Sequence, residues 1–334
     1  MNQQPTITAL MSVFNGEKWL LESLESMRNQ TFQDFEMLLI DDGSTDCTPD
    51  ILHDFAASDA RVRIITKGNT GLTDSLNIGL SEARGSWIAR MDADDVASPN
   101  RFELQIKHIT SEPNIVLVGS GFYVKNGVDL NDTVHYVPGT HTQLVRRLER
   151  MKGFFPHSSA MYKASTVRDI DGYDQNAKLN EDWDLWLRFS EVGQIAAVRK
   201  PLVLIRKHDD QITSMQNSNL RHVEQAYIST TCSLVRRRTN RNDHKSVMAD
   251  IRSDLVRISD GSKQFQAEMR MFRSRFVLSE LNKKDLDLLN RIKVTAKLLL
   301  DNFNVLRFIR HKFFGSSIPK LLAREYFEFG NTRN

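Results

Sequence analysis

The sequence predicts an α/β fold in which helices flank a mostly parallel sheet, followed by a helical C-terminal extension. Short apolar runs with strand character alternate with amphipathic helical patterns over the first 120 residues. A series of strands and helices of this kind pairs its strands in parallel. After residue 217 the pattern is nearly all helical, and it contains no further strand candidate.

The expected elements follow one another at short spacings. Strands are expected at residues 6–13, 35–40, 61–66 and 86–91, and helices at residues 17–30, 48–57, 71–84 and 98–111. Two helices open with a capping residue and a proline, Thr48-Pro49 and Ser98-Pro99. After residue 126 the periodicity blurs. The pattern there indicates a helix at 144–151, a strand at 158–162, a helix capped by Asn180 and strands within 195–206.

Composition places the chain among ordinary globular proteins. It has 334 residues, 40% hydrophobic and 26% charged, which allows two or three domains with sizeable cores. Cys47 and Cys232 lie far apart and show no metal-ligand spacing, so neither a disulfide framework nor a zinc site is expected. The N-terminal residues carry no signal-peptide pattern, and no run of about 18 apolar residues occurs. We therefore expect a cytoplasmic protein.

Charge divides the chain into two parts. Residues 1–224 carry 23 Lys and Arg against 31 Asp and Glu, whereas residues 225–334 carry 22 against 11. Together with the element pattern, this division predicts a first domain over residues 1–220 and a basic helical region over residues 221–334. Charge alone does not choose between an anionic partner and a solvated helical face for the basic region.

Acidic residues at two predicted strand ends are the main functional signal. Asp41 and Asp42 follow one apolar run, and Asp92, Asp94 and Asp95 follow another. Carboxylates crowded into a poorly solvated cleft repel one another unless a hard divalent cation neutralises them. Ligands of parallel sheets collect beyond the carboxyl ends of the strands. Each cluster alone is also ordinary turn or loop chemistry, but two such strand ends point to one shared site.

Glycine-rich phosphate loops are missing from the sequence. It contains no GxxxxGK[ST] segment, and no GxGxxG follows the first strand. We therefore expect carboxylates and a metal ion to hold a phosphate group in place of such a loop.

A series of segments carries a family pattern. They are ITALMSVFNGEKWL, LLIDDGSTDCT, NTGLTDSLNIGLSEARGSWIARMDADD with the following PNRFELQ, NEDWDLWLR and IRKHDDQIT, and they span residues 5–215. In this series the chain resembles glycosyltransferase family 2, the inverting nucleotide-sugar transferases with the GT-A fold, a Rossmann-like arrangement. The resemblance implies a catalytic domain over residues 1–220, with a nucleotide-binding half over 1–120 and an acceptor half over 121–220.

The resemblance implies roles for the acidic residues. Asp41 or Asp42 would accept hydrogen bonds from the base or ribose of the nucleotide. Asp92 would hold the ribose or a water molecule on the metal, and Asp94 would ligate Mg²⁺ or Mn²⁺ between the two phosphates. The cation would stabilise the charge of the departing nucleoside diphosphate. Asp95 would support the others by capping or by hydrogen bonds to the metal ligands.

Asp182 matches the general base of the family. Direct displacement at an anomeric carbon requires the acceptor hydroxyl to lose its proton as it attacks, and one carboxylate suffices for this. Because the ordinary pKa of an Asp is about 3.9, proton transfer must accompany bond formation. Alternatively, Glu181 and Asp182 are first-turn residues that complement a helix dipole, and both roles can hold together.

Further residues are assigned by the same resemblance. His208 matches a family histidine that completes the metal shell or contacts a phosphate, and the alternative for this lone histidine is a structural or exposed position. Asn69, Arg101 and Glu181 lie in matching segments, and we expect them to support the site. His157 either faces the acceptor or packs in the core.

The basic tail carries a separate signal. Residues 291–314 mix leucine, phenylalanine and isoleucine with arginine, lysine and histidine, which is typical of an interfacial helix on an anionic membrane. The alternative is that these apolar residues pack on the catalytic domain while the charges stay in water. We expect peripheral attachment to the inner face of a bacterial plasma membrane. Nucleic-acid binding is not expected, because no DNA- or RNA-reading motif accompanies the arginines.

The function that the resemblance implies is metal-dependent transfer of one sugar. The donor would be a nucleotide-sugar, in the first place a UDP-sugar, and the acceptor a saccharide or lipid-linked saccharide of bacterial surface-polysaccharide synthesis. One alternative is a sugar-nucleotide pyrophosphorylase, which the lack of a GxGxR-like N-terminal loop disfavours. Another is a non-catalytic nucleotide-binding scaffold, which the intact set Asp92, Asp94 and Asp182 disfavours.

Overall fold

The computed structural model describes residues 4–126, 133–149, 154–177 and 180–208, together with Ser229, Thr230 and Ser233. The chain divides into two units, Met1–Asn242 and Asp243–Asn334, and all of the described residues belong to the first. The predicted membrane-facing stretch 291–314 and most of the basic helical region 221–334 therefore lie outside the described residues. The domain boundary at residue 220 stays a prediction.

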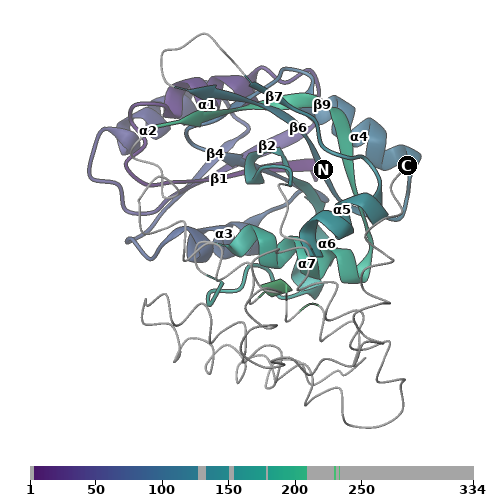
Figure 1. Cartoon of the computed structure of the whole chain (residues 1–334). Coiled ribbons are helices and arrows are strands. Elements are labelled where there is room, and N and C mark those ends of the chain that lie inside the picture. The colour runs from purple at the N-terminus through teal and green to yellow at the C-terminus, as the bar shows by residue number, and fades with distance from the viewer. Residues whose placement is uncertain are drawn as a thin grey trace, which may run out of the picture. The chain divides into compact units, whose positions relative to one another are not determined.

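A mixed sheet forms the centre of the described part (Figure 1). Its strands are β1 (Ile7–Val13), β2 (Phe35–Asp41), β3 (Val62–Thr66), β4 (Trp87–Asp92), β5 (Val96–Ala97), β6 (Ile115–Asn126), β7 (Thr133–His135), β8 (Met161–Lys163) and β9 (Gln194–Lys207). The strand order is β3-β2-β1-β4-β8-β6-β9-β5, and β7 pairs with β6. Strands β1 to β4 pair in parallel, whereas β8 runs antiparallel to β4 and β6, and β5 runs antiparallel to β9. The predicted α/β class is confirmed.

Helices cover both faces of the sheet (Figure 1). One apolar core lies under α1 (Leu20–Arg28), α2 (Thr48–Ser58) and α4 (Arg101–Ser111), and the other lies under α3 (Leu72–Glu82), α5 (His141–Glu149), α6 (Ala164–Asp169) and α7 (Glu181–Val192). Successive side chains of β1 alternate between the two cores, with Ala9 and Met11 in the first and Leu10 in the second. Burial on both faces explains why the central strands read as continuous apolar runs.

Some element boundaries differ from the sequence prediction. Helix α1 begins at Leu20, because the preceding residues form a turn. The predicted strand 158–162 is instead a short 3₁₀ turn, His157–Ser159, followed by β8. This turn is held locally, since the Ser159 hydroxyl donates to the Pro156 carbonyl at 2.9 Å and the Ala160 amide donates to the His157 carbonyl at 3.0 Å. Hydroxyl side chains that bond to nearby backbone in this way favour turns over strands.

The parallel register places the acidic strand ends at one edge. Val13 at the end of β1 pairs with Asp41, and Ser12 pairs with Asp92. Because adjacent strands lie about 4.8 Å apart, the backbones that carry Asp41 and Asp92 are about 10 Å apart across β1. The carboxyl ends of β2 and β4 therefore open toward the same side of the sheet.

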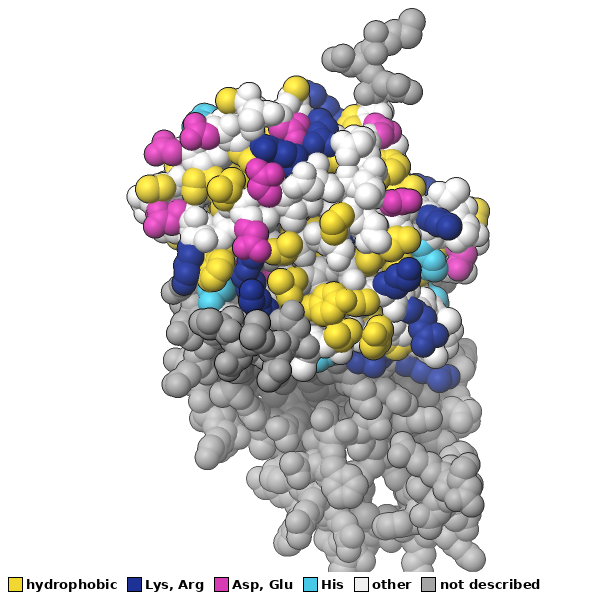
Figure 2. All heavy atoms as spheres, turned by 90° about the horizontal axis from the view of Figure 1, so that it is seen from above, with side chains coloured by type: hydrophobic (Ala, Val, Ile, Leu, Met, Phe, Trp, Pro, Cys, Tyr) yellow, Lys and Arg dark blue, Asp and Glu magenta, His cyan; other side chains and the backbone are white. Residues whose placement is uncertain are grey.

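The described surface carries charges of both signs, and apolar side chains gather at the lower centre of the face seen in Figure 2. Markedly exposed large apolar side chains of the described residues are Phe14, Leu21, Val134, Tyr136 and Val192. Phe14 is 49% exposed and directly follows β1, so it lies at the edge where the acidic strand ends meet. No helix in the described ranges is both long and apolar enough to cross a bilayer.

Candidate active site

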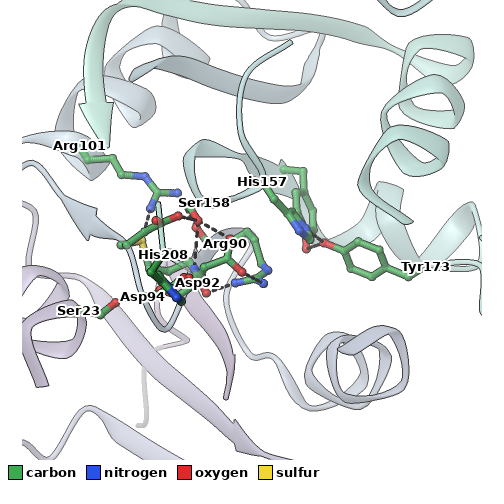
Figure 3. A network of polar contacts seen from close by, with 12 residues as sticks. Ser23, Arg90, Asp92, Asp94, Arg101, His157, Ser158, Tyr173 and His208 are labelled. Atoms are coloured by element: carbon green, nitrogen blue, oxygen red, sulfur yellow. Dashed lines mark hydrogen bonds and ion pairs between the residues drawn. The ribbon is translucent and has the colours of Figure 1, made fainter. Parts of the chain in front are cut away.

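The turn after β4 brings the acidic residues against the end of β9 (Figure 3). Strand β5, which follows Asp95, pairs antiparallel with β9. This pairing places His208 beside the turn, and its Nε2 lies 3.0 Å from Asp94 Oδ2. The Arg206 amide donates to Asp95 Oδ1 at 3.1 Å, and the Arg206 guanidinium donates to the Asp94 carbonyl at 2.8 Å. Residues more than one hundred positions apart in the sequence thus form one cluster.

Asp92 is the carboxylate of this cluster that pairs with a guanidinium. The guanidinium of the fully buried Arg90 forms an ion pair with it. The Ser158 hydroxyl donates to Asp92 Oδ2 at 2.5 Å, and the Ser23 hydroxyl donates to the Asp92 carbonyl at 3.0 Å. Burial by itself would raise the pKa of Asp92, but the charge of Arg90 and the hydrogen bonds hold it below its usual value. A third of the side chain, 33%, stays exposed, so a ligand can reach it.

Asp95 faces inward and has a different environment. It is 3% exposed, its Oδ2 contacts the Ser158 hydroxyl oxygen, and its Oδ1 accepts a hydrogen bond from the Arg206 amide. Burial, and then the charges of Asp92 and Asp94, raise the pKa of Asp95 well above its usual value. These contacts join Asp95 to the turn before β8 and to β9.

Asp94 and His208 are the residues that could hold a cation. Among the described residues no group of three or more His, Cys, Asp or Glu side chains could hold a metal ion. The pair nevertheless offers a carboxylate oxygen and an imidazole nitrogen 3.0 Å apart. Mg²⁺ is commonly held by one or two carboxylates plus substrate phosphates, and Mn²⁺ accepts both oxygen and imidazole ligands. The pair therefore fits a cation that is bound jointly with a diphosphate, and it does not fit a cage made of protein ligands alone.

Asp42 ties the loop before α3 to the end of β2. It is 3% exposed, and it accepts hydrogen bonds from the Lys67 ammonium and from the amides of Thr70 and Gly71, both at 2.9 Å. Burial would raise the pKa of Asp42, but these donors lower it below its usual value. The carboxylate is therefore fully engaged in holding the loop.

Asp41 ends β2, and Asn69 lies on the loop between β3 and α3 that approaches this strand end. Asp41 is 1% exposed, and its Oδ1 accepts a hydrogen bond from the Ser44 amide at 3.0 Å, which is the turn chemistry expected for this segment. Asn69 is exposed on the loop that Asp42 ties down. Gly43 has φ +76°, and a Cβ there would lie 2.8 Å from the Asn69 amide nitrogen. Only glycine lets the loop approach β2 this closely.

Glu181 and Asp182 are the first two residues of α7. Asn180 occupies the N-cap position but makes no side-chain capping bond. Asp182 Oδ1 accepts a hydrogen bond from the Trp183 amide at 2.6 Å. Burial, and then the charge of Asp182, raise the pKa of Glu181 to about 7, and Arg90 and Asp92 also influence it. The start of α7 is therefore within electrostatic range of the Asp92 carboxylate.

Replacing Glu181 by glutamine should change how stability depends on pH. The folded protein holds the proton of Glu181 up to about pH 7, whereas the unfolded chain releases it near 4.5, so stability is lost as the pH rises through this window. An amide does not titrate, so the variant should gain about 1–2 kcal/mol over the wild type between pH 5 and pH 8. Urea unfolding at both pH values measures this gain. In the control Glu112→Gln, at an exposed carboxyl, the free energy of unfolding should depend on pH as in the wild type. The same pH dependence for Glu181→Gln as for the wild type would contradict the burial argument.

Arg101 supports the site from within the core. Its side chain is fully buried, and its guanidinium donates to the carbonyls of Arg90 at 2.8 Å and Ala160 at 3.1 Å and to Gln105 Oε1 at 3.1 Å. Gln105 in turn donates to the Ser159 carbonyl at 2.8 Å. Arg101 thus joins β4, which carries Asp92, to the turn before β8.

Removing Arg101 should destabilise the fold. Arg101→Ala removes guanidinium donors from the Arg90 and Ala160 carbonyls and leaves a cavity in the core, so the free energy of unfolding should fall by about 2–4 kcal/mol. Urea unfolding at neutral pH measures the change. Arg84→Ala, at an exposed arginine on the loop before β4, should stay within about 0.5 kcal/mol of the wild type. A similarly small change for Arg101→Ala would remove the residue from its supporting role.

The sequence interpretation missed several residues at the site. Arg90 contacts Asp92, Ser158 contacts both Asp92 and Asp95, and Phe14 lies exposed between the acidic strand ends. An arginine inside the apolar run that precedes the aspartates is the one signal that could have been noticed, since a buried charge needs a partner. Nothing in the sequence near Ser158 indicates its partners, because they lie 63 and 66 positions away.

The chain is similar to known glycosyltransferases. The family described as Glycosyl transferase family 2 matches residues 8–171. EpsE of Bacillus subtilis (strain 168), which is named as a glycosyltransferase, is 36% identical over 198 residues, which cover 58% of this chain and 69% of EpsE. Among solved structures, residues 1–349 of S. aureus TarS in complex with UDP-GlcNAc match with a TM-score of 0.60 at 15% identity, over 81% of this chain and 80% of that chain. The mannosyltransferase PcManGT from Pyrobaculum calidifontis, in complex with GDP-Man and Mn²⁺, matches with a TM-score of 0.53 at 14% identity, over 91% of this chain and 84% of that chain.

The arrangement of sheet and helices is therefore that of a GT-A glycosyltransferase. The sequence matches identify the particular family: the chain belongs to glycosyltransferase family 2. The family and the enzyme class that the sequence resemblance implies are both confirmed.

Proposed function

We propose that the protein transfers one sugar from a nucleotide-sugar to a hydroxyl group of a saccharide or lipid-linked saccharide, with inversion at the anomeric carbon. A UDP-sugar is the favoured donor, and the product belongs to a bacterial surface polysaccharide. The observation that carries this proposal is the cluster of Asp92, Asp94 and His208 at the carboxyl end of β4, with the start of α7 in electrostatic range. Such a cluster suits a diphosphate that is bound with a cation.

On the donor side, Asp94 and His208 would hold Mn²⁺ or Mg²⁺ together with the diphosphate. When bound, the cation would neutralise the charge that develops on the departing nucleoside diphosphate. Asp41 or Asp42 would accept a hydrogen bond from the base or ribose, and Asp41 accepts fewer hydrogen bonds from the protein than Asp42 does. The half-exposed ring of Phe14 offers a face for stacking on the base. The ligands of TarS and PcManGT support a nucleotide-sugar, and that of PcManGT supports a divalent cation.

On the acceptor side, Asp182 would accept the proton of the attacking hydroxyl. Its carboxylate oxygen already takes one hydrogen bond from the Trp183 amide at 2.6 Å, which fixes the side chain at the helix start. No carboxylate is basic enough to ionise an alcohol beforehand, so attack and proton transfer occur together. A single displacement of this kind inverts the anomeric centre.

A panel of nucleotide-sugars tests the proposal. The enzyme is incubated with each donor and Mn²⁺, without an acceptor, and the released nucleoside diphosphate is measured. We expect slow hydrolysis of a single donor, and we expect this donor to be a UDP-sugar. Formation of a nucleoside triphosphate and a sugar 1-phosphate when pyrophosphate is added would favour a pyrophosphorylase. Binding without turnover of any donor, even with saccharide acceptors added, would favour a scaffold.

We also propose a cytoplasmic location with peripheral attachment to an anionic membrane through residues 291–314. The support is the mixture of apolar and basic residues in that stretch. Flotation of the full chain with liposomes should increase with the fraction of anionic lipid, and deletion of residues 291–334 should abolish it. Flotation that depends neither on the anionic lipid nor on residues 291–334 would refute the attachment.

A further inference from the structure

The 3₁₀ turn His157–Ser159 contacts both the acidic cluster, which Figure 3 shows beside Ser158, and helix α7, which carries Asp182. Its position follows from the sheet, because β8, which follows the turn, pairs antiparallel with β4. Adjacent residues of this turn make polar contacts in two directions. Ser158 contacts the carboxylates after β4, and His157 contacts residues that pack on α7.

The hydroxyl of Ser158 joins two carboxylates to the turn. Its oxygen is 2.5 Å from Asp92 Oδ2 and also contacts Asp95 Oδ2. The same oxygen accepts a hydrogen bond from the backbone amide of Asp92 at 3.2 Å. Ser158 itself is fully buried. Asp92 is therefore held by a guanidinium from its own strand and by a hydroxyl from the turn, and the orientation of its carboxylate depends on both.

His157 faces the other way. Its Nε2 lies 2.7 Å from the hydroxyl of Tyr173, which in turn lies 3.0 Å from the hydroxyl of Tyr162. The backbone of Tyr173 is clamped to α3, since its amide donates to Asn77 Oδ1 and its carbonyl accepts from Asn77 Nδ2, both at 2.8 Å. Burial, and then the charge of Arg90, lower the pKa of His157 to about 3, so the imidazole is neutral.

The same imidazole also contacts α7. Its ring packs edge-on against Trp186, with the ring centroids 5.7 Å apart. Trp186 lies four residues after Asp182, so both side chains project from one face of the helix. The Glu181 charge influences the pKa of Tyr173, which places that ring near the start of α7 as well.

We propose that His157 and Ser158 are positioning residues that set the donor-binding carboxylate and the base-bearing helix relative to each other. Ser158 orients Asp92 toward the nucleotide, and His157 fixes α7, and with it Asp182, through Trp186 and Tyr173. This inference rests on the proposed transfer reaction. Neither residue contacts the reacting atoms.

Single variants separate the two contacts. Ser158→Ala should raise the KM for the donor about tenfold, because Asp92 loses one charge-assisted hydrogen bond, and Ser158→Thr should restore it. His157→Phe keeps the ring but loses the hydrogen bond to Tyr173, and it should lower kcat about tenfold with the donor KM unchanged. His157→Gln, which can still bond to Tyr173, should recover part of that loss.

A matched control lies within the same turn. The Ser159 hydroxyl contacts only backbone, accepting from the Ser120 amide at 3.3 Å and donating to the Pro156 carbonyl at 2.9 Å. Ser159→Ala should therefore change neither kinetic constant more than about twofold, even if it lowers the melting temperature.

The outcomes distinguish the inference from the proposed function. If the wild type transfers no sugar from any donor, the proposed function itself fails. If the wild type is active and Ser158→Ala changes kcat and KM no more than Ser159→Ala does, Ser158 has no positioning role. If His157→Phe raises the donor KM and leaves kcat unchanged, the link to α7 is wrong. If the threonine and glutamine variants rescue nothing, the hydrogen bonds are not what these residues supply.

Discussion

Transfer by the Asp182→Asn variant is expected to fall about 10³-fold in kcat while the donor binds as before. An amide has the shape of the carboxylate but cannot accept the proton of the acceptor hydroxyl. The amide oxygen can still accept the hydrogen bond that the Trp183 N–H makes at 2.6 Å, so the side chain should keep its place at the start of α7. Steady-state kinetics with the identified donor and acceptor measure kcat, and calorimetric titration with the nucleoside diphosphate measures binding.

The same change at a surface position gives the control for Asp182→Asn. Asp169, at the end of α6, is exposed, and Asp169→Asn should retain wild-type kcat. If Asp182→Asn kept more than a tenth of wild-type turnover, Asp182 would not be the base. If it instead lost affinity for the nucleotide, the residue would belong to the donor side of the site.

Asp94→Ala is expected to weaken binding of the nucleoside diphosphate about 10²-fold when Mn²⁺ is present, and to change it little when the metal is chelated. Asp94 supplies the carboxylate beside His208 Nε2, and the imidazole alone would hold a hard cation poorly. Titration of UDP into the protein, with Mn²⁺ and with a chelator, measures both affinities. The wild type should bind UDP more tightly with the metal than without it.

An exposed aspartate on α2 gives the control for the metal ligand. Asp54→Ala removes one negative charge from an exposed position on α2. It should leave the affinity for UDP unchanged, both with Mn²⁺ and with a chelator. Equal affinity of Asp94→Ala and the wild type for UDP in the presence of Mn²⁺ would refute the assignment of Asp94.

The fold and the edge that carries the site were predictable because their causes are local. Apolar runs and helical periodicity predicted β1 to β4 and the helices between them, and parallel pairing follows from that alternation. Asp41 and Asp92 end strands that flank β1, so their shared edge follows from topology alone. The assignment of His208 to the site came only from the family resemblance. In the structure, the pairing of β5 with β9 brings His208 beside Asp94.

The remaining contacts depend on tertiary structure. The short antiparallel strand β8 fixes where Ser158 and His157 lie, and three residues of strand give too little periodicity to predict from sequence. The sequence suggested a strand over residues 158–162, and the first residues of that stretch form a turn in which the Ser159 hydroxyl bonds to the local backbone. Asp42 looked equivalent to Asp41, and only the loop of Lys67, Thr70 and Gly71 folded onto it shows that its oxygens are engaged.

The central claim is that Asp92, Asp94 and His208 form one site where a cation and a diphosphate bind together. Phosphorus-31 relaxation of UDP bound to the full-length protein with Mn²⁺ tests it most directly, because the relaxation caused by the paramagnetic ion falls with the sixth power of its distance from each phosphorus nucleus. We expect strong relaxation of both phosphorus nuclei in the wild type and loss of that effect in Asp94→Ala at matched UDP occupancy. Phosphorus signals that Mn²⁺ leaves unaffected in the wild type, or affects equally in Asp94→Ala, would contradict the claim.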